Sequence, residues 1–335
     1  MRIARHVDQV PAASLGRVLA IGNFDGVHLG HRKVLAAAVA QARATGRETA
    51  VLTFDPHPTL LLRPDLPHDM LTTFEDKAEQ FAVLGVDLTV CLHFDEAFSA
   101  LGPEQFVRRV LSPLSVREVF VGGNYKFGMG RSGNVETLTE LGRRYGFRVS
   151  AQDVFTTDGQ RVSSSRVRAL LRRGDVAQAS LMLARPYCLK GKVVAGRARG
   201  RELGYPTANL EIPEELVPEN GVYVARVAVW EPASRDTPSP GHPADAPVPP
   251  APPSRHDAIV YIGTRPTFLE VTRLIEVHLL DDFRDLYEHR IRVDFVDRVR
   301  PEMTFEGAEA LKLQIAQDLE AARHLLKAGA AMGTP

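Results

Sequence analysis

The strongest constraint on the fold is a turn, rich in glycine and histidine, that joins a short apolar run to a helical pattern. Val18–Ile21 predicts a buried parallel strand, and Arg32–Thr45 carries apolar residues at helical spacing. Between them, Gly22–His31 reads Gly-Asn-Phe-Asp-Gly-Val-His-Leu-Gly-His. A helix that begins at this turn offers unpaired N–H groups and the positive end of its dipole, which together favour a phosphate. The sequence therefore predicts a βα unit that binds an anion at its turn.

Two glycines and two histidines give this turn its chemistry. Gly26 and Gly30 let the backbone approach a ligand closely, and His28 and His31 are spaced to point the same way once the helix begins. Histidine donates hydrogen bonds near neutral pH, which suits charge that builds up on phosphorus. The pattern resembles the HxGH signature of the nucleotidyltransferase superfamily, whose members transfer a nucleotidyl group from a nucleoside triphosphate and release pyrophosphate. A tight βα turn with surface histidines is the alternative.

Composition narrows the class of protein. The 335 residues favour two domains, and 41 basic side chains balance 41 acidic ones, so no basic field favours a nucleic-acid partner. Cys91 and Cys188 lie far apart without metal-ligand spacing, which is typical of a reducing compartment. Residues 1–20 lack the apolar core of a signal peptide, and no apolar run reaches the ~18 residues of a membrane span. We expect a cytoplasmic protein that acts on small molecules.

Residues 1–184 alternate apolar runs with helical patterns, which predicts an α/β domain. The candidate strands are Arg17–Ile21, Thr49–Phe54, Asp87–Phe94, Val116–Val121 and Phe147–Val154, and the candidate helices are Arg32–Thr45, Thr73–Leu84, Asn134–Tyr145, Ser163–Arg173 and Val176–Ala184. This alternation favours a parallel sheet with helices on both faces. Ligands of such sheets bind at the carboxyl ends of the strands, where the Gly22–His31 turn lies.

Residues 185–335 predict a second, mostly β domain. The runs with period-two alternation are Gly221–Trp230, Ala258–Gly263, Arg273–Leu280 and Arg290–Val299. Strands without helices between them favour an antiparallel sheet or a small barrel, and Phe305–Lys327 predicts a closing amphipathic helix. Residues 231–257 are rich in proline and poor in bulky apolar side chains, so we expect a disordered insertion between two strands.

Three further segments of the first domain carry candidate ligand-binding residues. Thr53–Pro58 ends the second strand, which places Asp55 and His57 at the same sheet edge as the histidine turn. Val121–Gly133 is a glycine-rich loop with aromatic and basic residues, suited to a planar ring and a phosphate. Ser163–Arg168 opens a helix with three hydroxyls and two arginines, the donors of a triphosphate site. For each segment, an ordinary structural loop or helix cap is the alternative.

The second domain has two candidate sites. Gly191–Leu210 is dense in glycine and arginine and contains Pro206-Thr207-Ala208-Asn209. The Thr207 hydroxyl and the Asn209 carbonyl oxygen can reach one Mg²⁺ while neighbouring N–H groups hold phosphates. Glu276 alternates with apolar neighbours on a predicted strand, where it is either a general base for a substrate hydroxyl or a solvent-facing side chain.

With these segments in order, the chain resembles the family of bifunctional bacterial riboflavin kinase/FMN adenylyltransferases, the prokaryotic FAD synthetases. The resemblance extends from about Gly16 to Arg323. In the first domain it rests on GNFDGVHLGH, TFDPHP, GGNYKFGMGRSG and SSSRVR, and in the second on LGYPTANL, PENGVY, IGTRPT, EVHL and the closing helix. One departure is Glu288, where the family pattern has glycine in a flavin-side loop.

The resemblance implies a fold and a set of site residues. A Rossmann-like α/β nucleotidyltransferase domain (1–184) would precede a six-stranded antiparallel β-barrel riboflavin kinase domain with a C-terminal helix (185–335). His28 and His31 would be catalytic in adenylyl transfer, and Glu276 would be catalytic in the kinase reaction. ATP or phosphate binding is implied for Gly22, Asn23, Phe24, Gly26, Ser163, Ser164, Ser165, Arg168, Gly200 and Thr207, flavin binding for Asp55, His57, Asn124 and Phe127, and Mg²⁺ binding for Thr207 and Asn209.

The implied function is the synthesis of FAD in two steps that each use ATP and Mg²⁺. Riboflavin would be phosphorylated to FMN by the second domain, and FMN would be adenylylated to FAD by the first. The expected partners are riboflavin, FMN and ATP, with no nucleic acid and no membrane; an oligomer is compatible with the sequence. The alternatives are a chain that keeps one activity, or a flavin- or nucleotide-binding regulator. Retention of both His31 and Glu276 disfavours the first, and the lack of a helix-turn-helix or basic patch disfavours the second.

Overall fold

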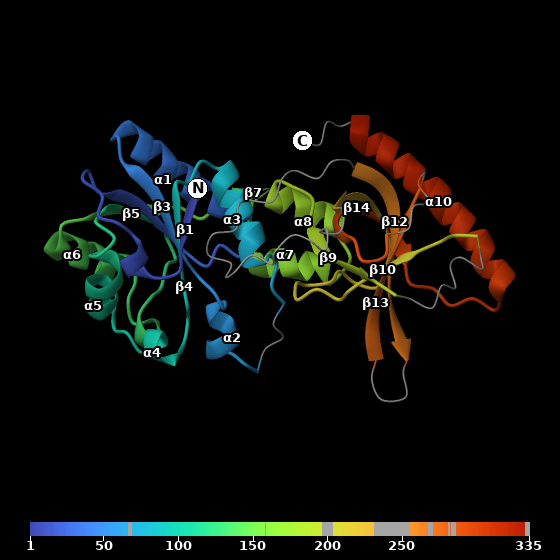
Figure 1. Ribbon diagram of the computed structural model, residues 1–335, viewed down its shortest axis with the longest axis horizontal. Coiled ribbons are helices and arrows are strands. Elements are labelled where there is room, and N and C mark those ends of the chain that lie inside the picture. Colours follow the sequence, from blue (N-terminus) through green and yellow to red (C-terminus); the bar gives the residue numbers. More distant parts are fainter. Residues whose placement is uncertain are drawn as a thin grey trace, which may run out of the picture. The chain divides into compact units, whose positions relative to one another are not determined.

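The computed structural model describes residues 1–65, 69–157, 159–195, 204–230, 255–266, 271–280, 282 and 286–331 (Figure 1). Packing separates a unit that ends at Ser164 from a unit that begins at Ser165. The predicted boundary at 184/185 lies after two short helices, α7 (Ser164–Leu171) and α8 (Val176–Leu183). Because α8 packs against strand β14 (Arg290–Pro301), the division by packing falls at the start of α7 rather than after α8.

A six-stranded parallel sheet forms the centre of the first unit. Its strands are β1 (Arg2–Ala4), β2 (Arg17–Ile21), β3 (Glu48–Phe54), β4 (Leu88–Leu92), β5 (Val116–Gly122) and β6 (Arg148–Gln152). They pair in the order β1-β4-β3-β2-β5-β6, and every neighbouring pair is parallel. From β2 the chain builds outward through β3 and β4, then crosses to β5 and β6 on the other side. The order therefore reverses at β2, and sheets of this kind bind ligands at the carboxyl ends of the strands beside that reversal.

Helices cover both faces of this sheet, as the sequence predicts. They are α1 (Leu29–Ala44), α2 (Pro58–Leu62), α3 (Phe74–Val83), α4 (Glu96–Ser99), α5 (Pro103–Phe106), a π-helical turn (Val107–Leu111) and α6 (Val135–Tyr145), with 3-10 turns at Val7–Gln9 and Met129–Arg131 and a small ribbon of β7 (Thr156–Thr157) and β8 (Gln160–Arg161). One core packs α1 and α3 against Val18 and Ala20, and the other packs α5, the π-helical turn and α6 against Leu19 and Ile21. Successive residues of β2 thus face opposite cores, which explains its unbroken apolar run.

The predicted strands and long helices of this unit are confirmed, with ends that shift by a few residues. The sequence patterns missed β1 and the short helices α2, α4 and α5. Each of these elements has three to five residues, too few to repeat a period of two or of 3.6.

The second unit is a closed six-stranded antiparallel barrel, as predicted. Strands β9 (Cys188–Val194), β10 (Ala208–Leu210), β11 (Gly221–Trp230), β12 (Arg255–Pro266), β13 (Val271–Leu279) and β14 pair in the order β10-β13-β12-β11-β14-β9, and β9 closes on β10. Periodicity did not select β9 and β10, because β9 is interrupted by Gly191 and β10 has three residues.

The predicted disordered insertion at 231–257 needs one correction. Arg255, His256 and Asp257 belong to β12, because they pair with Ala228, Val227 and Arg226 of β11. The rest of the predicted insertion, 231–254, lies outside the described residues.

The closing helix, α10 (Ala308–Ala331), packs on the outer face of β11, β12 and β14. Ala322 and Leu326 are buried there against Val224 and Leu280, which confirms the predicted apolar stripe. Among the helices that the structure describes, none combines the length and the apolar character needed to cross a membrane.

A buried arginine fixes the amino end of β2. The Arg17 side chain is 1% exposed and donates hydrogen bonds to the Glu48 carboxylate at 2.6 Å, the Leu114 carbonyl at 2.9 Å and the Pro11 carbonyl at 2.7 Å. Removing the Arg17 side chain would leave the Leu114 and Pro11 carbonyl groups without this donor and the Glu48 carboxylate without its buried cation. These groups lie at the amino end of β2, whereas the histidine turn follows its carboxyl end.

We therefore predict that Arg17→Met lowers the free energy of unfolding of the first unit by about 3 kcal/mol, the cost of breaking a buried ion pair. Trp230, the only tryptophan of the chain, lies in β11, so its fluorescence follows the barrel while far-ultraviolet circular dichroism follows both units. In urea titrations of this variant, the circular dichroism transition of the first unit should move to lower urea concentration. The fluorescence transition of the barrel should stay in place. Arg2→Met is the control, since Arg2 also contacts Glu48 but is 57% exposed. An equal loss in both variants would contradict the prediction.

Candidate active sites

The Gly22–His31 turn joins the carboxyl end of β2 to α1, and its backbone is strained. Phe24 and Val27 have φ angles of 51° and 41°, a region that residues other than glycine rarely occupy. Gly26 lies between them with a φ of 81°, where a residue without Cβ carries no such strain. Strain of this kind persists only where the surroundings hold it in place, and it is frequent at ligand-binding sites.

A buried carboxylate holds this turn. Asp25 is 2% exposed, and its Oδ1 accepts hydrogen bonds from the Leu71 N–H at 3.0 Å, the Thr72 N–H at 3.2 Å and the Thr72 hydroxyl at 3.3 Å. The Thr72 hydroxyl oxygen in turn accepts the Gly26 N–H at 3.0 Å. The Ser164 hydroxyl donates to the Asp25 carbonyl at 2.9 Å, so a residue predicted for ATP lies at the turn. Sequence reasoning assigned nothing to Asp25 or Thr72, because their contact spans forty-seven residues.

The two histidines stack on each other. Their ring centroids lie 3.6 Å apart with planes inclined by 17°, and the His28 Nδ1 accepts the His31 N–H at 3.3 Å as the N-cap of α1. The His28 Nδ1 therefore carries no proton in this arrangement. The His31 Nδ1 is buried and has no hydrogen-bond partner within the described part of the chain. Burial is the main cause that holds the pKa of His31 well below 6.5, with smaller contributions from His28 and Lys77.

A buried lysine faces the same turn. Lys77 of α3 is 3% exposed, and four residues later Phe81 meets the Phe24 ring edge-on at 5.5 Å, so this face of α3 turns toward the histidine turn. Burial lowers the pKa of Lys77, and the charge of Asp25 partly opposes that effect. The sequence patterns did not single out Lys77, because it sits among ordinary charged residues of an amphipathic helix.

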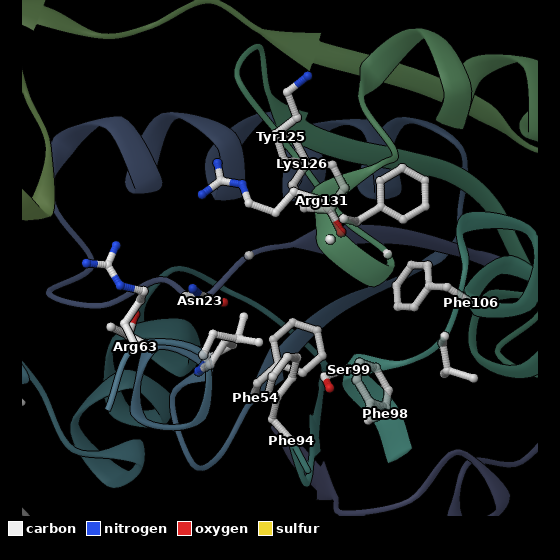
Figure 2. Close-up of a pocket in the computed structure, with 18 residues that line it drawn as sticks. Asn23, Phe54, Arg63, Phe94, Phe98, Ser99, Phe106, Tyr125, Lys126 and Arg131 are labelled. Carbon is white, nitrogen blue, oxygen red and sulfur yellow. The ribbon is translucent and has the colours of Figure 1, made fainter. Parts of the chain in front are cut away.

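A cavity of about 570 Å³ opens at the carboxyl ends of the strands (Figure 2). Phe54, Phe94 and Phe98 meet one another at ring distances of 5.4 to 5.6 Å. Phe106, Phe127 and Tyr125 continue this aromatic wall, with Tyr125 stacked on Phe127 at 5.5 Å. Gly22 and Asn23 line the cavity next to the histidine turn, and the cationic ends of Arg63 and Arg131 lie apart from the phenyl rings in Figure 2. A cavity with flat apolar walls and cationic groups fits a planar ring that carries a phosphate.

Of the four residues predicted to bind flavin, Phe127 alone lines this cavity. Asp55 forms an ion pair with Arg5 at 3.1 Å, and the His57 Nδ1 accepts the Thr59 N–H as the N-cap of α2. Asn124 is exposed in the loop after β5. Four aromatic residues of the wall, Phe54, Phe94, Phe98 and Phe106, were not predicted, because they come from separate segments. Tyr125 belongs to the Val121–Gly133 loop, whose aromatic residues the sequence suggested for a planar ring.

The residues predicted for ATP divide into several groups. Phe24 packs its ring in the core, and the Gly26 N–H is bonded to Thr72. Ser165 and Arg168 belong to α7 beyond the division between the units, and their role in binding ATP stays a prediction, as does that of Ser163. Gly200 lies outside the described residues.

In the barrel, strand register brings the second set of predicted residues together. Asn209 of β10 lies directly opposite Glu276 of β13, and Glu276 lies directly opposite Tyr261 of β12. Ile275 and Val277 are buried on the other face of β13, so Glu276 belongs to the outer face of the barrel. A carboxylate, an amide and a phenol thus form one row across three strands. Thr207, half-buried, precedes β10 by one residue.

A hydrogen-bonded network continues from the end of this row. The Tyr261 hydroxyl donates to the Glu302 carboxylate at 2.5 Å, and Glu302 also accepts from the Asn220 side chain at 2.9 Å. The Asn220 oxygen accepts from Arg273 at 3.1 Å. Partial burial and the Glu302 hydrogen bond raise the pKa of Tyr261 above its ordinary range, so its hydroxyl keeps its proton.

Glu288 occupies a position that favours glycine. Its φ is 69°, and its carboxylate pairs with the Lys192 ammonium. The hydrogen bond from Lys192 holds the pKa of the Glu288 carboxyl below its usual range. A side chain at a left-handed position, tied to β9 by an ion pair, restricts a turn that glycine would leave free.

Comparison with known proteins places both units. The FAD synthetase family model matches residues 10–166, and the riboflavin kinase family model matches residues 183–326. A relative from Escherichia coli K12 named bifunctional riboflavin kinase/FMN adenylyltransferase is 35% identical over 96% of this chain and 97% of its own. A relative of the same name from Listeria monocytogenes is 36% identical over 91% of this chain and 90% of its own.

One solved structure matches along nearly the full length of the chain. A crystal structure described as a macrolide-efflux protein from Streptococcus pneumoniae has a TM-score of 0.81 at 25% identity, covering 96% of this chain and 98% of that one. The architecture of both units is therefore shared with a solved protein.

The lowered pKa of His31 predicts how stability depends on pH. The unfolded chain takes up a proton at this histidine near pH 6.5, whereas the folded chain does so only at lower pH. The stability that neutral His31 contributes is thus complete above about pH 6.5 and is lost as the pH falls toward the folded-state pKa. Urea titrations at pH 7.5, 6.5 and 5.5, followed by circular dichroism, measure the unfolding midpoint of the first unit. This midpoint should fall less with decreasing pH in His31→Asn than in the unmodified chain. His93→Asn, at an exposed position, should leave the decline unchanged; equal slopes for His31→Asn and the unmodified chain would refute the assignment.

Proposed function

The chain belongs to the family of bifunctional riboflavin kinase/FMN adenylyltransferases, and on that premise we propose how its residues divide the work. The second unit phosphorylates riboflavin to FMN, and the first adenylylates FMN to FAD with release of pyrophosphate. The observation that carries the proposal is the presence of two unlike sites in one chain. One is an aromatic cavity beside a histidine turn, and the other is a carboxylate row on the face of a barrel.

In the first unit, FMN lies in the aromatic cavity with its ring against the phenyl wall. An oxygen of its phosphate attacks the α-phosphorus of ATP, and the bond from that phosphorus to the pyrophosphate oxygen breaks. His28 and His31 stabilise the negative charge on the α-phosphate oxygens, together with the N–H groups that α1 leaves unpaired at its start. A neutral His31 serves as a hydrogen-bond donor there, which agrees with its lowered pKa.

In the second unit, Glu276 accepts the proton of the riboflavin 5′-hydroxyl. The hydroxyl oxygen bonds to the γ-phosphorus of ATP, and the bond to the β-phosphate oxygen breaks to release ADP. Asn209 lies opposite Glu276, and Thr207 lies two residues before Asn209. Both suit this step, because they can hold the nucleotide while Glu276 faces the hydroxyl. Phosphoryl transfer of this kind depends on positioning and charge stabilisation rather than on covalent help from the protein.

Mg²⁺ enters this proposal through Thr207 and Asn209. Both offer oxygen ligands, which Mg²⁺ prefers, and Asn209 stands opposite Glu276 in the row. Among the described residues, no three His, Cys, Asp or Glu side chains gather into a metal site. Few protein ligands combined with substrate phosphates are the usual way to bind Mg²⁺. When bound with ATP, the ion neutralises charge on the phosphates.

The two activities should separate by single substitutions. His28→Ala should abolish FAD formation and spare FMN formation, whereas Glu276→Ala should do the reverse. The experiment incubates each variant with ATP, Mg²⁺ and either riboflavin or FMN, and follows the flavins by chromatography. Loss of both activities in one folded variant would contradict two independent sites. Production of FMN alone by the unmodified chain would show that one activity is retained.

The aromatic wall should govern the affinity for FMN. Tyr125→Ala removes a ring that stacks on Phe127 and should raise the KM for FMN about tenfold in adenylyl transfer, as expected for a lost aromatic contact with its buried area. Tyr125→Phe keeps the ring and should stay near the unmodified value. Quenching of FMN fluorescence measures binding directly, and the kinase activity of the same variant reports its integrity. An unchanged KM in Tyr125→Ala would place the flavin elsewhere.

A further inference from the structure

One buried histidine of the barrel, His278, contacts the segment that leads into Thr207 and β10. His278 lies two residues after Glu276 on β13, so both side chains belong to the same face of the strand. It is 7% exposed, and its Nδ1 lies 2.7 Å from the Pro206 carbonyl oxygen. A carbonyl oxygen only accepts hydrogen bonds, so the Nδ1 is the protonated nitrogen. The Tyr205 ring contacts the same imidazole edge-on, at 6.0 Å and 86°.

Among the described residues, the strand ladder of β10 stops short of the segment that leads into it. β10 pairs with β13 through Ala208, Asn209 and Leu210, and the ladder begins at the pair of Ala208 with Val277. The next position of that register would join Thr207 to His278. In place of a strand pair, the His278 side chain bonds the carbonyl one residue earlier.

We propose that His278 is a positioning residue of the kinase reaction, which fixes Thr207 on the face of Glu276 through its hydrogen bond to the Pro206 carbonyl. The inference rests on the proposed function of Thr207 and Glu276. Proline fixes one backbone angle of its residue, so a bond to its carbonyl also orients the following peptide, which leads into Thr207. The spacing between the general base and the nucleotide-binding hydroxyl is then set by one side chain on the strand of the base.

A near-isosteric pair of substitutions isolates the hydrogen bond. Asparagine places its amide nitrogen close to the position of the His278 Nδ1, whereas leucine has a similar shape and donates nothing. His278→Leu should raise the KM for MgATP in FMN formation about tenfold, the effect of a buried hydrogen bond lost. His278→Asn should recover most of that loss. The KM for riboflavin should change little in either variant, because the anchored segment carries the nucleotide ligands.

Binding without turnover gives a second readout. Calorimetric titration of ADP, with and without Mg²⁺, should show a weaker Mg²⁺-dependent affinity in His278→Leu than in His278→Asn. ADP bound by the first unit is common to all variants and cancels in this comparison. His324→Leu, at an exposed position of α10, is the control and should match the unmodified chain in all measurements.

Three outcomes overturn the inference: unmodified nucleotide binding and KM in His278→Leu, equal losses in both variants, or a loss confined to riboflavin. Trp230 fluorescence during urea unfolding reports whether the barrel of each variant is folded. If His278→Leu does not fold, the comparison of His278→Asn with the unmodified chain decides. A tenfold rise of the KM for MgATP in His278→Asn would then count against the proposal. Glu276→Ala, measured in parallel, keeps the two proposals apart. Retained kinase activity in Glu276→Ala would contradict the proposed function itself. Loss of kinase activity in Glu276→Ala, together with unchanged His278 variants, would contradict only this inference.

Discussion

The first site depends on the buried carboxylate of Asp25. A turn with two non-glycine residues at positive φ does not keep that shape by itself, and the turn has no strand ladder to hold it. Asp25 supplies the missing constraint, because its side chain bonds Leu71 and Thr72 while its carbonyl accepts the Ser164 hydroxyl. Three segments distant in the sequence thereby meet at one residue. The histidine stack, the start of α1 and the mouth of the cavity all follow from the shape that this carboxylate imposes.

The fold could be predicted from the sequence wherever the signal is local. The buried run of β2, the apolar face of α1 and the alternation along β13 each follow from a period within one segment, and the histidine turn follows from its place between strand and helix. The aromatic cavity could not be predicted in this way. Phe54, Phe98 and Phe106 look like ordinary core residues in the sequence, and only the order of the parallel strands brings them to one edge, beside the loop whose aromatic residues suggested a planar ring.

Proximity to the right edge does not establish a role, as the Thr53–Pro58 segment demonstrates. Asp55 and His57 do lie at the carboxyl end of β3, as predicted. Asp55 pairs with Arg5 and His57 caps α2, and the role of both in flavin binding stays a prediction. In the barrel the reverse holds, because register alone places Asn209 opposite Glu276 although the sequence separates them widely. The parallel sheet thus builds its site from strand ends, and the antiparallel barrel builds its site from the middle of strands.

The charges around the histidine turn agree with the proposal that it binds a phosphate. Burial, His28 and, to a smaller extent, Lys77 hold the pKa of His31 well below its ordinary value, and burial also lowers the pKa of Lys77. A neutral His31 can donate a hydrogen bond to a phosphate, and the negative charge of a phosphate would stabilise the ammonium of Lys77. The charge of Asp25 partly opposes the effect of burial on Lys77, which lets a strained turn, a buried lysine and a histidine of lowered pKa coexist in a folded chain.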